Sequence, residues 1–146
     1  MNRRVTMVLL ALAAAACGRE QWREADAHLN TASQDARDSG FAPMSGPHNT
    51  FGDFTSHGEV PWRVHLEAHQ PYFIAAVCTS GCDTLDFTVT EPHGSPLAAD
   101  TGSGGVARLL LQAPEEGDYR VTFRYGKCAV AKCRWVAQVY AKETHQ

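Results

Sequence analysis

Residues 62–78, with the sequence WRVHLEAHQPYFIAAVC, contain two strand patterns that a short turn separates. Trp62, Val64 and Leu66 alternate with charged or polar residues, which is the period of a strand with one buried face. The turn ends at Pro71, and residues 72–77 are then almost continuously apolar. A run this short favours a buried strand over a helix. The stretch therefore predicts two successive strands, the second of them buried.

The same strand signals continue towards the C-terminus. Alternating or apolar segments occupy residues 85–90, 106–111, 119–125 and 133–140, and residues 96–99 fit a short edge strand. Turns rich in Gly and Pro separate these segments, and none is followed by a convincing crossover helix. Short strands at short intervals are typical of an all-β fold, an antiparallel β-sandwich or jelly-roll.

The 146-residue chain is long enough for one modest domain. Residues 19–39 are polar, with a weak helical stripe that includes Trp22 and Leu29. The alanine-rich stripe favours a tether or frayed helix over docking on the β domain. The predicted organisation is a signal peptide over 1–16, a polar helix or tether with a Gly/Pro-rich linker over 17–57, the sandwich over 58–141, and a tail over 142–146.

The N-terminus has the parts of an export signal. Arg3 and Arg4 precede a short apolar run over residues 8–16. A permanent membrane span needs about 20 apolar residues, so this run is too short to be one. Cleavage at an Ala-x-Ala site within residues 14–16 would release a soluble protein. The run ending in Cys17 also resembles a bacterial lipobox, which implies acylation of Cys17.

Lipidation of Cys17 makes the lipid bilayer the first expected partner. The residue after Cys17 is not Asp, which favours an outer-membrane lipoprotein over a periplasmic or secreted protein. The net charge is -3, and removal of the signal takes away two arginines and no acid. A more negative mature chain argues against nucleic acid as a partner. An envelope protein or a glycan remains as a second partner.

Four further cysteines form two close pairs, Cys78 with Cys82 and Cys128 with Cys133. In an exported protein they are expected to form disulfides, and four cysteines allow three pairings. The local pairing is favoured because each pair brackets a tight turn beside a glycine. A cross-pairing, a zinc site and a redox-active pair are the alternatives. The bracketed loops are the first place to expect a binding surface.

Several motifs in residues 58–141 resemble a bacterial pre-peptidase C-terminal (PPC-like) domain. They are the segments 64–78 and 82–87, the Pro92-His93-Gly94 turn, Asp100, and the Gly117-Asp118-Tyr119-Arg120-Val121 segment. The resemblance implies a β-sandwich, and its cysteine pairs resemble a subgroup of small exported proteins of unknown role.

The chain departs from that family pattern at two positions. His69 stands where a turn glycine is usual, and Thr84 replaces the first Asp of an acidic pair. No peptidase domain is attached in this sequence, so the usual role beside a secreted protease does not carry over whole.

Two sets of residues are candidates for binding. Acidic residues that could gather at one edge would suit calcium, although solvated turn carboxylates are the favoured alternative; they are Asp83, Asp86, Glu91 and Asp100. Tyr72 and Tyr140 are candidates for stacking on a sugar or peptide, provided that both are exposed.

The chain contains no Gly-x-Ser-x-Gly elbow, and its serines lie mostly in turns where serine is ordinary. We therefore expect a non-catalytic binding or structural module at the cell envelope, without a cofactor. A calcium-assisted polysaccharide- or protein-binding accessory domain is the first alternative. A small envelope hydrolase is the second.

Overall fold

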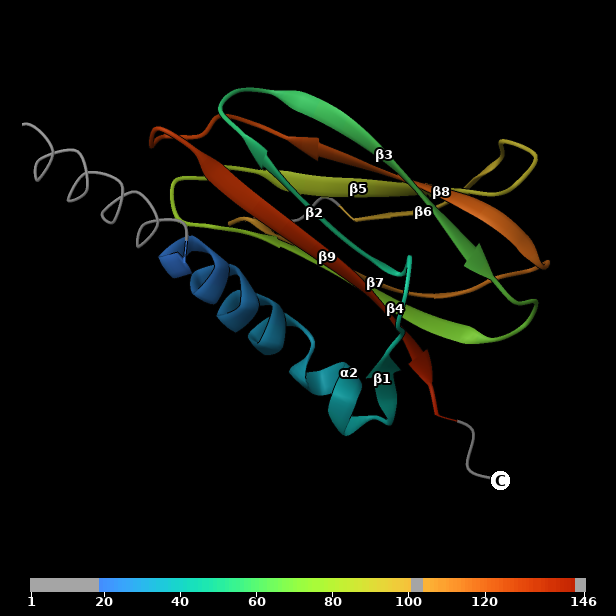
Figure 1. The fold of residues 1–146 in the computed structure, drawn as a ribbon. Helices are drawn as coiled ribbons and strands as arrows, with labels where there is room; N and C mark the ends of the chain where they lie inside the picture. Colours follow the sequence, from blue (N-terminus) through green and yellow to red (C-terminus); the bar gives the residue numbers. More distant parts are fainter. Residues whose placement is uncertain (1–18, 101–103, 144–146) are drawn as a thin grey trace, which may run out of the picture.

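The computed structural model describes residues 19–100 and 104–143, and the predicted signal peptide and Cys17 lie outside them. Two antiparallel sheets face each other, as Figure 1 shows. The five-stranded sheet has the order β1-β9-β4-β7, with β2 also paired to β9. Its strands are β1 (Phe41–Pro43), β2 (Asn49–Phe54), β4 (Pro71–Cys78), β7 (Val106–Gln112) and β9 (Cys133–Lys142).

The four-stranded sheet has the order β3-β8-β5-β6. Its strands are β3 (Gly58–Leu66), β5 (Leu85–Thr90), β6 (Pro96–Asp100) and β8 (Gly117–Tyr125). Every pairing in both sheets is antiparallel. The predicted all-β sandwich is therefore confirmed.

The core lies between the two sheets and is rich in aromatic residues. Phe87, Phe123 and Tyr119 are fully buried on the four-stranded sheet, and Trp135 faces them from β9. The ring centroids of Phe123 and Trp135 are 4.9 Å apart. Side chains in a strand point alternately to opposite faces, so each of these strands presents every second residue to the core.

Helical residues 19–32 and α2 (Gln34–Asp38) lie against the five-stranded sheet, on the face away from the core (Figure 1). Ala25 and Ala32 pack on Val77 and Val136, so the tether favoured from the sequence is wrong. A second apolar layer covers β4 and β9, which explains why both strands are buried on both faces. No helix in the described part of the chain is long and apolar enough to cross a membrane.

The expected Gly/Pro-rich linker over residues 40–57 instead contains two strands. β1 pairs with the end of β9, and β2 pairs with its first half, from Asn49 opposite Gln138 to Phe54 opposite Cys133. Together they cover an edge of β9 whose backbone groups need hydrogen-bond partners. Phe54 is buried in the core, whereas Phe51 is 64% exposed. The sandwich therefore begins before residue 58.

The two local disulfides are confirmed. Cys78 bonds to Cys82 and Cys128 bonds to Cys133. The loops that they close, residues 78–82 and 128–133, are called the stapled loops below. They lie side by side, since Ala129 N donates to the Gly81 carbonyl at 2.7 Å and Cys82 forms a β-bridge with Cys128.

His69 occupies the turn before β4 in a left-handed conformation, with φ of 62°. This is the position where the family pattern has glycine, which adopts positive φ without a steric penalty. The His69 backbone is held from both sides, because its N–H donates to the Ala113 carbonyl and its carbonyl accepts from the Gln112 side chain. These bonds retain the turn without a glycine.

Candidate functional site

The two tyrosines predicted as a binding surface are buried. Tyr72 is 1% exposed and points into the core, where its hydroxyl accepts a hydrogen bond from Glu67 N at 2.9 Å. Tyr140 is 4% exposed and packs with Ala36 of α2 and with Phe73. Burial raises the pKa of both hydroxyls. The exposed aromatic platform expected from these residues is therefore wrong.

The four acidic residues predicted to gather do not share one edge. Asp83 and Asp86 lie at the start of β5, whereas Glu91 follows its end, about 16 Å away along the strand. Asp100 lies on β6, and its Oδ2 accepts a hydrogen bond from Arg108 N at 2.6 Å. The set proposed for calcium is not assembled in the structure; of its four members, Glu91 is the one that joins a group of three ligating residues within the described parts of the chain.

The stapled loops, also expected as a binding surface, are partly covered by the chain's own helix. Glu24 accepts hydrogen bonds from the backbone and hydroxyl of Ser80, which lower the pKa of its carboxyl. Gln21 donates to the Lys132 carbonyl at 3.0 Å. These contacts make the loops a docking platform for the helix.

The other sheet face is open. The outer side of the four-stranded sheet carries a shallow groove of about 810 Å³, called the sheet-face groove. Residues of β3, β5 and β8 form its floor, and the turn between β5 and β6 forms one end. Its lining consists of Glu59, Arg63, Thr88, Thr90, Glu91, Pro92, His93, Gly94, Asp118, Arg120, Thr122 and Arg124.

Most charged side chains on this sheet face have a partner of opposite sign. Arg124 pairs with Glu59 at 3.3 Å. His65 lies between two carboxylates, with Nδ1 3.0 Å from Asp118 and Nε2 3.3 Å from Glu116. The hydrogen bonds to Asp118 and Glu116 raise the pKa of His65, and the negative charges of the two carboxylates raise it further.

Arg63 and Arg120 break that pattern. They are direct cross-strand partners on β3 and β8, and both are exposed in the groove. Within the described ranges, no carboxylate lies within ion-pair distance of either guanidinium. Like charges directly opposite each other in a sheet repel, so an anion between them would stabilise the pair.

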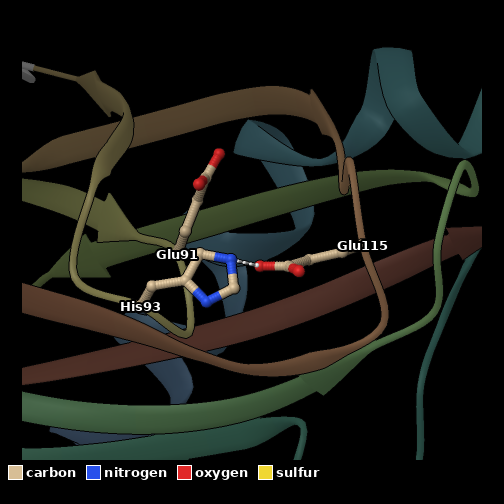
Figure 2. A group of neighbouring side chains, drawn as sticks. All are labelled: Glu91, His93 and Glu115. Carbon is tan, nitrogen blue, oxygen red and sulfur yellow. Dashed lines mark ion pairs between the residues drawn. The ribbon is translucent and has the colours of Figure 1, made fainter.

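A second cluster lies at the end of the groove. Glu91 and His93 come from the β5–β6 turn, and Glu115 comes from the β7–β8 turn. One ligand atom from each lies within 4.8 Å of the others, and Figure 2 shows the imidazole of His93 facing the Glu115 carboxylate. We call these three residues the turn cluster. Two carboxylates and an imidazole are residue types that ligate metal ions.

The close contact of the two turns depends on Gly117. A Cβ atom at this position would lie 2.7 Å from Cγ of Pro92, closer than carbon atoms pack. The Glu115 backbone is also fixed, since the buried Tyr119 hydroxyl donates to its carbonyl at 2.7 Å and accepts from its N–H at 3.3 Å. This is a tyrosine-corner arrangement, in which a buried tyrosine hydroxyl bonds back to the backbone a few residues upstream.

Sequence reasoning identified Glu91 alone among the turn cluster and missed Arg63 with Arg120. The signal for the arginines was available, because both fall on the polar side of alternating strands. Their pairing depends on the β3–β8 register, which alternation alone does not fix. His93 and Glu115 lie in different turns and meet only through the fold.

No protein-family model matches the chain, and no curated protein matches it in sequence. Solved structures resemble it at low identity. A periplasmic inhibitor of g-type lysozyme from Aeromonas hydrophila is 18% identical with a TM-score of 0.48, and the match covers 69% of this chain and 93% of that chain. The pre-peptidase C-terminal domain of a Bacillus anthracis collagenase is 12% identical with a TM-score of 0.47, over 62% of this chain and 88% of that chain.

A carbohydrate-binding module from a Cellvibrio mixtus lichenase, in complex with cellotriose, is 12% identical. Its TM-score is 0.38, and the match covers 73% of this chain and 89% of that chain. The similar structures thus include a domain of the type that the sequence resembles.

Proposed function

We propose that this protein is a non-catalytic envelope lipoprotein whose sheet-face groove binds an acidic polysaccharide. The observation that carries the proposal is the juxtaposition of Arg63 and Arg120 without a carboxylate partner among the described residues. A guanidinium presents parallel N–H donors that match a carboxylate in a bidentate geometry. Two of them, side by side on a rigid sheet, suit a ligand with carboxylates along its length.

The remaining lining of the groove favours a saccharide over a protein surface. Protein interfaces depend on buried aromatic or aliphatic anchors at their centre. Among the described residues that line the groove, none is aromatic and Pro92, at its end, is the one apolar side chain; Thr88, Thr90 and Thr122 instead supply hydroxyl groups along its floor. Hydroxyl and guanidinium groups together match the hydroxyls and carboxylates of a uronate-containing chain.

The binding test is a calorimetric titration of the mature protein with oligogalacturonate at low ionic strength. We expect saturable binding that added salt weakens, and little binding of a neutral oligosaccharide of equal length. R63Q and R120Q should each weaken binding about 10-fold or more, since each removes a charged hydrogen-bond partner. R108Q, which changes an exposed arginine of β7 outside the groove, is the matched control.

Two results would contradict this function. Equal binding of the neutral oligomer would show that charge does not drive binding. Unchanged affinity in R63Q and R120Q would show that the ligand does not bind in the groove. Binding of an acidic peptide but not of oligogalacturonate would keep the anion site and reject the saccharide. Turnover by the wild-type protein in a broad esterase and peptidase screen would reject the non-catalytic assignment.

Export and lipidation are the second part of the proposal. Disulfides are typical of extracytoplasmic proteins, and both local bridges support export. Intact-mass measurement of the mature protein from membranes should give a chain that begins at Cys17 with added acyl groups. Reductant should then raise the mass by four hydrogens, two for each disulfide. A soluble chain cut before Cys17 without acyl mass would reject the anchor.

A further inference from the structure

We propose that Glu91, His93 and Glu115 form a binding site for a divalent transition-metal ion, for which Zn²⁺ is the reference. One ligand atom of each residue lies within 4.8 Å of the other two. Zinc bonds of about 2.1 Å place two ligands of a tetrahedral site about 3.4 Å apart. The widest pair therefore has at most about 1.4 Å to close, and His93 and Glu115, which are now in direct contact, have to move apart; side-chain rotation supplies both movements.

The donor set selects the kind of ion. Calcium takes six to eight oxygen ligands, and magnesium keeps most of its water. An imidazole nitrogen with two carboxylate oxygens instead suits zinc and neighbouring first-row metals. The site is therefore distinct from the calcium set considered from the sequence, with which it shares only Glu91.

Hydrogen bonds within the protein hold the backbone on both sides of the site. In the β5–β6 turn, Glu91 N donates to the Ser95 carbonyl at 2.8 Å, and Gly94 N donates to the Glu91 carbonyl at 2.9 Å. The Tyr119 hydroxyl holds the Glu115 backbone through two hydrogen bonds. An ion would thus bridge two turns whose positions are fixed in advance, with a small ordering cost.

Glu115 and His93 already contact each other. Oε1 of Glu115 is shut off from solvent, and its polar neighbour among the described residues is Nε2 of His93, with which it forms an ion pair. A carboxylate oxygen and an imidazole nitrogen both offer lone pairs to a metal ion. An ion inserted between the two groups would be held by both, which supports a ligand role for each.

The surroundings of His65 show what a non-binding arrangement looks like. This histidine also has two acidic neighbours, but Asp118 contacts Nδ1 and Glu116 contacts Nε2. The two ring nitrogens point in different directions, so no single ion reaches one nitrogen and both carboxylates. His65 is therefore a matched control for His93, with similar exposure and similar charge around it.

The proposed ion would lie at the end of the sheet-face groove, since Glu91 and His93 also line it. Three protein ligands leave a fourth position for water or for an oxygen of a bound molecule. The metal site needs neither the saccharide nor the lipid, so its test is separate from that of the proposed function.

The first experiment is calorimetric titration of metal-free, oxidised mature protein with Zn²⁺. We expect one saturable equivalent per chain. H93Q and E115Q should weaken binding at least about 10- to 100-fold, a loss seen even when an outer-shell partner is removed. H65Q should bind like the wild-type protein. Absence of a saturable equivalent, or equal loss of affinity in H65Q, would overturn the site.

The second experiment needs no variant and so does not depend on the folding of one. Co²⁺, added to isotope-labelled wild-type protein, should shift or broaden the amide resonances of residues 91–95 and 114–117 first. Zn²⁺ should displace it and restore the spectrum. Paramagnetic effects centred on another part of the protein would place the metal elsewhere and overturn the proposal.

Discussion

Replacement of Gly117 by alanine tests whether the close approach of the two turns creates the turn cluster. The added Cβ would lie 2.7 Å from Cγ of Pro92. Carbon atoms pack at about 3.5–4.0 Å, so the turns must separate by about 0.8–1.3 Å. The pyrrolidine ring of Pro92 cannot rotate out of the way, because it is closed onto its own backbone. The displacement therefore passes to the backbone of the turns.

Two opposing effects set the change in stability. Overpacking of this size costs about 1–3 kcal/mol, whereas replacing glycine by alanine gains about 0.4–1 kcal/mol by restricting the unfolded chain. We expect G117A to lower the free energy of unfolding by about 1–2 kcal/mol and the Tm by about 3–10 °C. The separation would also lengthen the ion-pair contact between Glu115 and His93.

The assay is thermal unfolding of four proteins, namely wild type, G117A, P92A and the double variant. P92A removes Cγ, and the nearest remaining atom is then Cβ at 3.4 Å from the new alanine carbon. The double variant should therefore be more stable than the sum of the two single changes predicts. A G117A protein as stable as wild type, or strictly additive effects in the cycle, would refute the steric argument.

Three further predictions concern the rest of the domain. W22A should lower the free energy of unfolding by about 1–3 kcal/mol in urea titrations, because Trp22 lies 4.0 Å from the Arg134 guanidinium and 4.8 Å from the ring of Phe51. Arg134 holds the pKa of Asp53 below its usual value, so the stability advantage of wild type over D53N in Tm measurements should disappear as pH falls through that lowered pKa. The pKa of His65 is raised, so its advantage over H65Q should be full below about pH 6.5 and disappear as pH rises through the raised value.

The alternation of apolar and polar residues correctly predicted the strands that have one solvent-exposed face. Leu85, Phe87 and Val89 are fully buried on β5, while the residues between them are half-buried. Strand β8 behaves in the same way. These strands belong to the four-stranded sheet, whose outer face meets solvent, so their sequences carry the period of two.

The strands that sequence reasoning missed lack that period. β2 has the sequence NTFGDF and contributes mainly backbone hydrogen bonds to β9, which leave no side-chain pattern. Gly52 falls in the segment that the sequence predicts to be a Gly/Pro-rich linker. In the structure it lies within β2, where a Cβ would meet Nε1 of Trp135 at 2.8 Å. In the sequence, a glycine whose missing side chain makes room for a neighbouring aromatic ring looks the same as a glycine that forms a turn.

The helix explains the wrong prediction for Tyr140. Alternation places this residue on the outer side of β9, which is correct, but α2 covers that side. The sequence of β4 indicated that something must cover the outer face of this sheet, because both faces of the strand are apolar. Phe73, Ala75 and Val77 face away from the core, and such a face needs a covering layer. The segment 19–39, with its weak apolar stripe, was the candidate in the sequence for that covering layer.

The two ends of the domain carry different features, the stapled loops with the helix at one end and the turn cluster at the other. Helical residues near Gln21 and Glu24 bind the stapled loops, whereas the turn cluster lies beyond the opposite end of β5 (Figure 1). Cys17 is four residues before Gln21 in the sequence. The acyl anchor proposed at Cys17 would therefore join the chain shortly before the residues that bind the stapled loops. The helix covers the outer face of the five-stranded sheet, so among the described residues the outer face of the four-stranded sheet, with its sheet-face groove, is the broad sheet surface left open.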